Sequence, residues 1–375
     1  MIVLSHLRWD FVFQRPQHLL SRAAADFDVV FLEEPIHADE TVPRLEIAER
    51  AGGIRVAQPM LPQGMDEAGA VAAQRAIIDE LAARAGGPLV LWYYTPMALA
   101  FSRHLEADLV IFDKMDELSA FRNAPPLLLE LEEELLARAD IVFTGGASMH
   151  RAAAHRHANI HCFPSSIDAP HFGVARRGAA DPADQGSAGR PRLGYFGVID
   201  ERMDLALVAQ VADLRPDWQL MMIGPVVKID PASLPQRANI HWLGGRTYDE
   251  LPAYLANWDI GFMPFALNES TKFISPTKTP EFLAAGLPVV STAITDVVTP
   301  YGDEGLVEIA ASAEAVVAAV ERLLSADRAP WLARVDARLA RGSWDQTWAA
   351  MRSQIAKKAS EGWRRHPGQA LHPRR

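Results

Sequence analysis

The sequence predicts an α/β protein built from two Rossmann-like domains. The chain has 375 residues, and at about 150 residues per domain this length favours two domains. Short apolar runs alternate with longer helical patterns in both halves, which is typical of consecutive βα units and a mostly parallel sheet. A polar stretch, residues 176–190, separates the halves. We therefore expect two sheets whose strand ends face a ligand cleft.

The N-terminal domain is expected over residues 1–175. Its apolar runs predict strands at residues 2–5, 28–32, 53–57, 89–94, 109–112, 141–143 and 159–163. Helical patterns begin at Pro16 and Glu67, and near Pro96, Pro125 and Ser148. Pro16 and Pro125 suit a first helical turn, where a missing N–H group costs nothing.

The segment 176–190 is expected to be a linker, because Gly, Pro, Ser, Ala and Asp replace any apolar periodicity there. The C-terminal domain follows over residues 191–342. Its strands are expected at 193–198, 219–223, 240–243, 260–264, 288–292 and 306–309, and its helices at 204–214, 248–258, 280–285, 313–324 and about 330–340.

A last helix is expected over residues 343–358, followed by a polar, basic tail over 359–375. Ser343 is a good N-cap, and an apolar stripe follows it at helical spacing. This stripe must be buried either on the second domain or across on the first. The basic residues around Trp363 leave weak contact with an anionic membrane surface as an alternative to a solvated tail.

The composition excludes several classes of protein. A formal net charge of −10 and a pI near 5.7 argue against a nucleic-acid binder. A single cysteine, Cys162, excludes an intramolecular disulfide. The start of the chain has too few apolar residues for a signal peptide, and no uncharged run reaches the roughly 18 residues needed to span a bilayer. We expect a cytoplasmic protein.

The strongest local signal is the stretch 275–290, which predicts a loop, a short helix, a glycine stop and a buried strand. Thr277, Lys278 and Thr279 would form a phosphate cradle, with the Lys278 ammonium adding full charge. The Glu281 carboxylate offers two acceptors to the vicinal hydroxyls of a ribose. The alternative is that Glu281 only complements the helix dipole and that Lys278 is solvated.

These residues resemble a known family. Thr277-Lys278-x-x-Glu281-x-Leu283-Ala284-x-Gly286-x-Pro288-Val289-Val290 is similar to the donor-site motif of retaining, nucleotide-sugar-dependent glycosyltransferases with the GT-B fold, the group 1 or family 4-like enzymes. The supporting stretches are 257–264, 142–145 and 163–168, together with Trp9-Asp10, residues 15–20 and Phe112-Asp113-x-x-Asp116-Glu117-Leu118-Ser119. The resemblance implies an N-terminal acceptor domain, a C-terminal donor domain and a last helix that crosses back to the N-terminal domain.

One position departs from the family. A second glutamate commonly stands eight residues before the ribose-binding one and contacts the donor sugar, but Phe273 occupies this position here. Glu269 lies four residues further upstream, and a slightly longer loop would bring it or Asn268 to the sugar. We therefore carry Glu269 as a candidate catalytic residue.

The first strand and turn of the second domain supply two further candidates. Gly197 lets the backbone approach a nucleotide, and Arg202 can bind two phosphate oxygens. The alternative is an ordinary turn with a surface arginine beside Asp200 and Glu201.

In the N-terminal domain, the segment 5–10 and Arg15 are expected to face the ligand. Asp113 and Asp116 follow the strand 109–112, and one of them would accept a hydroxyl proton or orient a sugar, so that Asp116 is a candidate catalytic residue. No spacing of His, Cys and Asp indicates a dedicated metal site, and the scatter of histidines from His150 to His161 is typical of a solvated surface.

The resemblance implies a hexosyltransferase-type enzyme of polysaccharide biosynthesis. It would move a sugar from a nucleotide-diphosphate sugar to a saccharide or lipid-linked glycan, with retention of configuration. No cofactor is expected, since the nucleotide sugar is a substrate. Two alternatives remain: an epimerase-like sugar-nucleotide enzyme on the same scaffold, and a non-catalytic protein that binds a nucleotide or glycan. A nicotinamide oxidoreductase is disfavoured because no GxGxxG follows an early strand.

Overall fold

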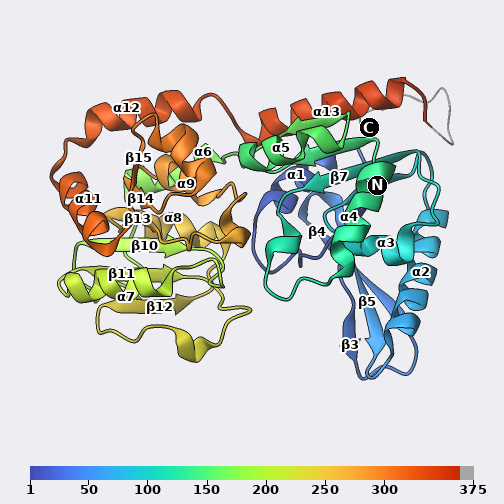
Figure 1. Cartoon of the computed structure of the whole chain (residues 1–375), viewed down its shortest axis with the longest axis horizontal. Coiled ribbons are helices and arrows are strands. Elements are labelled where there is room, and N and C mark those ends of the chain that lie inside the picture. The colour runs from blue at the N-terminus through green and yellow to red at the C-terminus, as the bar shows by residue number, and fades with distance from the viewer. Residues whose placement is uncertain (364–375) are drawn as a thin grey trace. The chain divides into compact units, whose positions relative to one another are not determined.

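The computed structural model describes residues 1–363, and the chain divides into two compact units (Figure 1). One unit joins Met1–Pro164 to the segment from Asp345 onward, and the other is Ser165–Trp344. The division at Pro164 and Ser165 precedes the boundary expected at residue 175. Residues 364–375 of the expected basic tail lie outside the described residues.

The first unit contains one sheet of nine strands. These are β1 (Ile2–Leu4), β2 (Val30–Leu32), β3 (Ile36–Ala38), β4 (Arg44–Arg50), β5 (Ile54–Pro62), β6 (Val90–Tyr93), β7 (Leu109–Lys114), β8 (Ile141–Thr144) and β9 (Ile160–Cys162). The order is β3-β5-β2-β1-β6-β7-β8-β9, and every pair on this path is parallel. The expected alternation of strands and helices is therefore confirmed.

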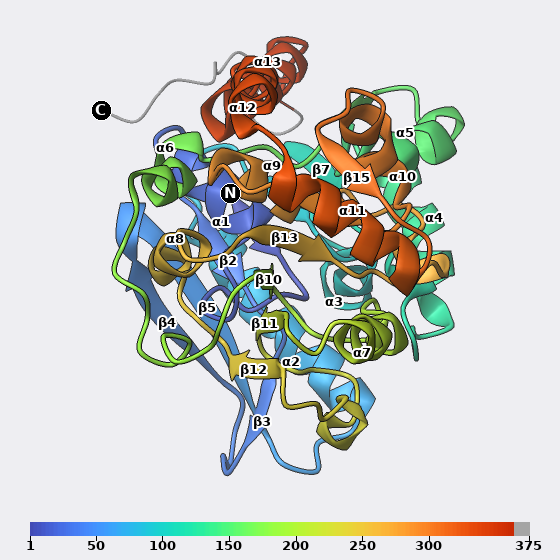
Figure 2. The ribbon, with the colours of Figure 1, turned by 90° about the vertical axis from the view of Figure 1, so that its left-hand side faces the viewer.

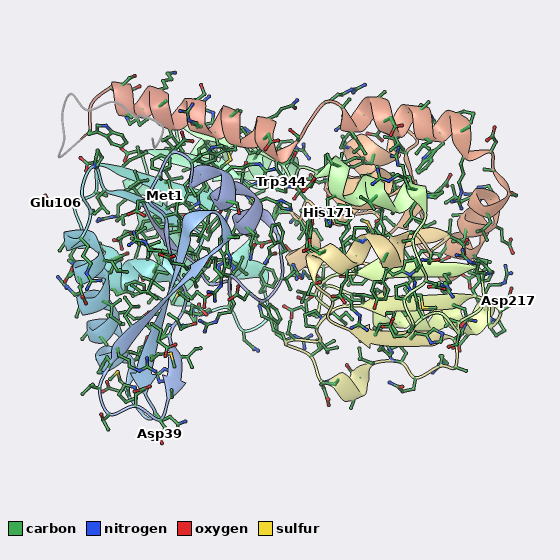
Figure 3. All side chains as sticks on the ribbon, turned by 180° about the vertical axis from the view of Figure 1, so that it is seen from behind. Met1, Asp39, Glu106, His171, Asp217 and Trp344 are labelled. Atoms are coloured by element: carbon green, nitrogen blue, oxygen red, sulfur yellow. The ribbon has the colours of Figure 1, made fainter. Side chains whose placement is uncertain are left out.

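The short strand β3 was not expected from the sequence, and neither was β4. The strand β4 pairs with β5 in antiparallel register, from Arg44 opposite Met60 to Arg50 opposite Ile54. Most of its side chains are exposed on both faces, so it lacks the period-two apolar signal of a half-buried strand. The pairing extends β5 to Pro62, beyond the expected end at Ala57. Asp39 marks the outer end of this extension (Figure 3).

The helices of the first unit cover this sheet. They are α1 (Arg15–Ala23), α2 (Glu67–Ala83), α3 (Leu99–Ser102), α4 (Leu127–Arg138), α5 (Ala147–Ala153) and the part of α13 (Trp344–Ser360) that begins at Asp345. Leu19 and Leu20 of α1 are fully buried. Pro16 stands in the first turn of α1, as its missing N–H group predicts.

The helix α13 packs against the first unit through its apolar stripe. Met351 and Ile355 are fully buried. The Trp348 indole Nε1 donates a hydrogen bond to Asp26 Oδ2 at 3.2 Å, and its ring centroid lies 6.4 Å from that of Trp92. Burying a stripe of this kind outweighs the weak propensity of an isolated helix.

The second unit contains a parallel sheet of six strands. They are β10 (Arg192–Phe196), β11 (Gln219–Ile223), β12 (Ile240–Gly244), β13 (Ile260–Met263), β14 (Val289–Ser291) and β15 (Val307–Ile309). The order is β12-β11-β10-β13-β14-β15, which is the doubly wound order of a Rossmann fold. Figure 2 shows the ribbons of β10, β11, β12 and β13 in this unit.

The helices of the second unit are α6 (Ala169–Gly173), α7 (Leu205–Leu214), α8 (Leu251–Leu255), α9 (Lys278–Ala284), α10 (Thr295–Val297), α11 (Ala313–Ser325) and α12 (Arg328–Leu339). Two glycines let aromatic rings reach the sheet. A Cβ at Gly194 would overlap the Trp258 ring, and one at Gly261 would lie 2.7 Å from the Phe282 ring.

The segment 176–190 is not a free linker, which corrects the expectation. It folds back over β10 within the second unit and surrounds the Arg192 guanidinium, which is 3% exposed. Arg192 donates to Asp181 and to the carbonyls of Gln185 and Ala188. The Gln185 side chain accepts a hydrogen bond from the Trp258 indole at 2.9 Å. Polar side chains hold this segment, so an apolar pattern could not reveal it.

Candidate functional site

In the second unit, the sheet order reverses between β10 and β13. Loops leave the carboxyl ends of these neighbouring strands in opposite directions, and open parallel sheets bind ligands at such a switch point. Gly197 follows β10, and Phe265 lies two residues after β13. The Arg202 carbonyl accepts a hydrogen bond from the Ala266 N–H group at 2.8 Å, so the two loops are joined.

The Lys278 side chain crosses directly over Gly197. A Cβ at Gly197 would overlap Lys278 Cε and lie 2.5 Å from Nζ, and the φ of Gly197 is +124°, which side chains rarely adopt. The Lys278 ammonium lies 5.5 Å from the Tyr195 ring centroid and 5.9 Å from that of Phe265. Glycine is therefore required at position 197 to hold a cation at the carboxyl end of β10.

Glu281 lies one helical turn after Lys278 and is buried, with 6% of its surface exposed. Burial raises the pKa of Glu281 to about 7, while the Lys278 charge and a hydrogen bond from Thr277 favour the carboxylate and the nearby Asp168 opposes it. The structure thus brings together Thr277, Lys278 and Glu281, as the motif predicts, and adds Asp168.

The remaining member of the predicted cradle, Thr279, points the other way. Its side chain is fully buried, and its hydroxyl donates to Met263 Sδ at 3.6 Å. The first turn of α9 directs this hydroxyl into the core, so the expected phosphate cradle would use the backbone N–H groups of this turn and the Lys278 ammonium, and it stays a prediction.

Arg202 is near the switch point but is held by an acid. Its guanidinium donates to both carboxylate oxygens of Asp200, with the shortest distance at 2.7 Å, and Asp200 is 3% exposed. This pairing orients the guanidinium beside the β10 loop. A phosphate would share the guanidinium with Asp200.

Glu269 does not point into a closed site. It begins a short 3₁₀ turn, its side chain is 80% exposed, and its carboxylate lies 3.5 Å from Lys272 Nζ. Asn268 next to it reaches the β10 loop, with Nδ2 3.4 Å from the Glu201 carbonyl. The Phe273 ring has the Lys272 ammonium 5.5 Å from its centroid.

The first unit has its own switch point, between β1 and β6. Ser5 follows β1 and Tyr94 follows β6. Beside them, Arg15 forms a buried ion pair with Asp113, with 2.9 Å between Nη2 and Oδ1. Arg15 also donates to the Phe163 carbonyl at 2.7 Å, close to the end of this unit.

Asp113 is a structural carboxylate, not a candidate base. It is fully buried, and burial raises its pKa although Arg15 opposes this change. Asp116 lies two residues after β7 and is half-buried. Of the two carboxylates expected at this edge, only Asp116 has exposed surface for a substrate.

A buried network that the sequence did not reveal supports the loop with Asp116. Lys114 is 2% exposed, and its Nζ lies 2.6 Å from Glu132 and 3.0 Å from Glu117. Arg156 binds the other oxygen of Glu132 at 2.7 Å. A lysine at the end of an apolar strand normally indicates a solvated position, so the sequence would have placed the Lys114 side chain in water.

Within residues 1–363, no cluster of three His, Cys, Asp or Glu side chains could hold a metal ion. In this same part of the chain, no helix is long and apolar enough to cross a bilayer.

The two units, each with polar groups at the switch point of its sheet, define an α/β protein with two Rossmann-like domains. Residues 190–326 match the model of the family described as Glycosyl transferases group 1. This segment holds the candidate donor-site residues Gly197, Arg202, Lys278 and Glu281, and the match agrees with the resemblance found in the sequence.

A curated relative also matches the chain. It is the putative teichuronic acid biosynthesis glycosyltransferase TuaH of Bacillus subtilis, 28% identical over 236 residues. The alignment covers 58% of this chain and 59% of that protein.

Solved structures share the fold across both units. The sucrose-phosphate synthase of Thermosynechococcus elongatus has a TM-score of 0.72 at 15% identity and covers 95% of this chain and 98% of its own. A trehalose-6-phosphate protein from E. coli, bound with UDP-2-fluoro glucose, has a TM-score of 0.68 at 12% identity, with 94% and 98% covered. The predicted two-domain GT-B architecture is confirmed.

Proposed function

We propose that the protein is a glycosyltransferase whose second unit binds a nucleoside-diphosphate sugar at the β10/β13 switch point. The observation that carries this proposal is the Lys278 ammonium held over Gly197, one helical turn from the buried Glu281. A cation beside a carboxylate at the end of a Rossmann strand suits a diphosphate attached to a ribose. The group 1 family match over residues 190–326 supports the same function.

In this proposal, Glu281 accepts hydrogen bonds from the ribose hydroxyls and Lys278 binds the diphosphate. As the bond from the anomeric carbon to the diphosphate oxygen breaks, negative charge grows on that oxygen, and the nearby ammonium stabilises it. The acceptor hydroxyl forms the new bond to the same carbon and loses its proton, for which Asp116 is the candidate recipient. The role proposed for Glu269 is to contact the donor sugar.

The donor and acceptor are assigned by class. UDP-hexoses come first as donors, because the similar E. coli structure is bound with UDP-2-fluoro glucose. The acceptor is a saccharide or a lipid-linked glycan, in line with the relative named as a teichuronic acid biosynthesis enzyme. Retention of anomeric configuration is inferred from the resembled family. A cytoplasmic location and weak contact with a membrane surface remain part of the proposal.

A matched pair of lysines tests the donor site. We expect Lys278→Ala to weaken UDP binding by about 10–100-fold, the range for a hydrogen bond to a charged group, while uridine binding changes little. Lys272→Ala is the control, because Lys272 is an exposed lysine on the same stretch of chain. Isothermal titration of both variants with both ligands makes the measurement. Equal losses in the two variants would contradict the donor site.

Turnover separates the proposed enzyme from its alternatives. A transferase releases UDP only when an acceptor is supplied, and it forms a new glycoside. An epimerase-like enzyme changes the sugar nucleotide without an acceptor, and a binding protein does neither. Product analysis of a nucleotide-sugar panel, with and without oligosaccharide acceptors, distinguishes these three outcomes.

A further inference from the structure

A cavity of about 340 Å³ lies entirely within the first unit, at the carboxyl ends of β1, β2 and β6. Residues of α2 and of α3 with the turn before it complete its lining. This volume is at the lower end of the range of about 300–1,000 Å³ for small-molecule pockets. It therefore has room for one small ligand.

Two buried hydroxyls lie at the strand ends in this cavity. Ser5 is 4% exposed and Thr95 is 5% exposed. Each oxygen accepts a backbone hydrogen bond, Ser5 Oγ from the Leu7 N–H group at 3.0 Å and Thr95 Oγ1 from that of Met97 at 3.3 Å. These bonds use oxygen lone pairs, so each hydroxyl hydrogen can be donated to a ligand oxygen.

The walls of the cavity are mostly apolar. They are formed by side chains from β2, α2 and α3 with its preceding turn, namely Leu32, Val71, Met97 and Phe101. Ala70 of α2 also lines the cavity, and its small side chain leaves part of the space open. An apolar wall of this extent favours a ligand with a methyl or similar group over a ligand that is polar all round.

The charges around the cavity are acidic. Glu33, Glu34 and Glu67 line it, and no Lys, Arg or His does. A compensating cation comes from Arg8, whose guanidinium donates to Glu33 at 3.1 Å and also to Gln58 and the Glu34 carbonyl. A ligand carrying a phosphate or carboxylate would meet repulsion here, with no basic side chain in the lining to bind it.

We propose that this cavity binds an uncharged N-acylated amino sugar, the unit of the acceptor that the first unit recognises. The acyl carbonyl accepts from the Ser5 and Thr95 hydroxyls, and the acyl methyl packs on the apolar wall. Sugar hydroxyls donate to the carboxylates at the rim. This inference rests on the proposed glycosyltransferase function and names its acceptor class.

The test is saturation-transfer NMR on the full chain with N-acetylglucosamine, glucose and glucose 6-phosphate as probes. We expect the strongest saturation on the acetyl methyl protons, weaker signals from glucose, and no displacement of the acetylated sugar by glucose 6-phosphate. Binding of glucose 6-phosphate equal to or better than that of the acetylated sugar would overturn the proposal.

Two variants of α2 locate the binding. Ala70→Phe fills the cavity and is expected to remove at least nine-tenths of the acetyl signal. Ala72→Phe is the matched control, since Ala72 is exposed on the same helix and does not line the cavity. Val71→Phe repeats the test at a second lining residue, in case Ala70→Phe does not fold. An acetyl signal that survives in a folded cavity-filling variant assigns the sugar elsewhere and contradicts the proposal.

The donor site provides the reference that keeps the two proposals separate. Both cavity-filling variants are expected to bind UDP like the unmodified chain, because their side chains belong to the first unit. Loss of acetyl binding with UDP binding retained supports the cavity assignment. Acetyl binding in a chain that never binds UDP would overturn the donor proposal and leave the cavity as a sugar site.

Discussion

At the scale of single residues, the candidate donor site contains ionisable groups that are buried, so that water does not solvate their charges. Glu281 is the clearest case, because its carboxylate is buried and its pKa lies at about 7, above the ordinary value of 4.5. The Lys278 charge and the Thr277 hydrogen bond favour its ionised form but do not outweigh burial. A ribose would add two hydroxyl donors, so ligand binding and ionisation of Glu281 are expected to favour each other.

The raised pKa of Glu281 in the folded chain predicts a pH dependence of stability. The folded chain holds the Glu281 proton more tightly than the unfolded chain, so the free energy of unfolding should fall as pH rises from about 4.5 to about 7, by up to about 3 kcal/mol. Glu281→Gln should remove this contribution. Urea unfolding at pH 5 and pH 8 measures it, and Glu130→Gln on the exposed side of α4 is the control. The same slope in the Glu281→Gln variant and in the unmodified chain would refute the assignment.

Gly197 supports a second prediction at this scale. Gly197→Ala places a methyl group against the Lys278 stem at a φ that alanine rarely adopts, so both Lys278 and the loop must shift. We expect UDP affinity to fall at least about 10-fold and stability to fall by about 1–3 kcal/mol. Gly189→Ala is the control, since a methyl group there meets nothing within 4 Å. Calorimetry and thermal unfolding report the two effects, and unchanged UDP affinity in Gly197→Ala would be the contrary result.

At the scale of elements, the sequence was informative where burial creates a pattern. Apart from β3 and β4, the strands of both sheets were predicted because their apolar residues alternate or form continuous runs, and the apolar stripe of α13 was predicted because it recurs with a period near 3.6. The strand β4 and the segment 176–190 were missed because charge and hydrogen bonds, not apolar burial, hold them in place.

The residues of the candidate site also fall into those that the sequence predicted and those that it did not. Lys278 and Glu281 come from a local motif with a recognisable spacing. The buried network around Lys114 joins residues that are distant in sequence. The inward orientation of the Thr279 side chain depends on how α9 packs. Neither feature produces a sequence pattern that could predict it. The same holds for the buried ion pair of Asp113 with Arg15, which are 98 positions apart.

The segment 176–190 yields a prediction of its own. Arg192→Met keeps the aliphatic stem but removes the guanidinium, which binds Asp181 and four backbone carbonyls, three of them within the segment. We therefore expect a loss of about 3 kcal/mol and release of the segment. Arg190→Met is the control, because that side chain is half exposed. Limited proteolysis should cut within 178–190 in Arg192→Met first. Equal resistance of both variants would show that Arg192 does not anchor the segment.

At the scale of the whole molecule, each unit should respond separately to loss of its own tryptophan. Trp348→Ala removes a buried ring from the interface of α13 with the first unit, at an expected cost of about 3–5 kcal/mol. Trp331→Ala, in α12 of the second unit, is the matched change. Hydrogen exchange should show faster opening of β1 and β6 only in Trp348→Ala, with UDP binding retained there. Faster exchange of β10 and β13 in that variant would contradict this separation.

The division of the chain into two units also determines which unit can finish folding first during translation. The second unit is one continuous stretch, whereas the first is assembled from two pieces with the whole second unit between them. While a ribosome produces residues 165–344, the faces of Phe27 and Trp92 that later meet Trp348 have no cover. Domains generally fold as units as they emerge. Here the unit that is translated first is therefore completed last, and its apolar face around Phe27 and Trp92 stays open to chaperones until α13 has been made.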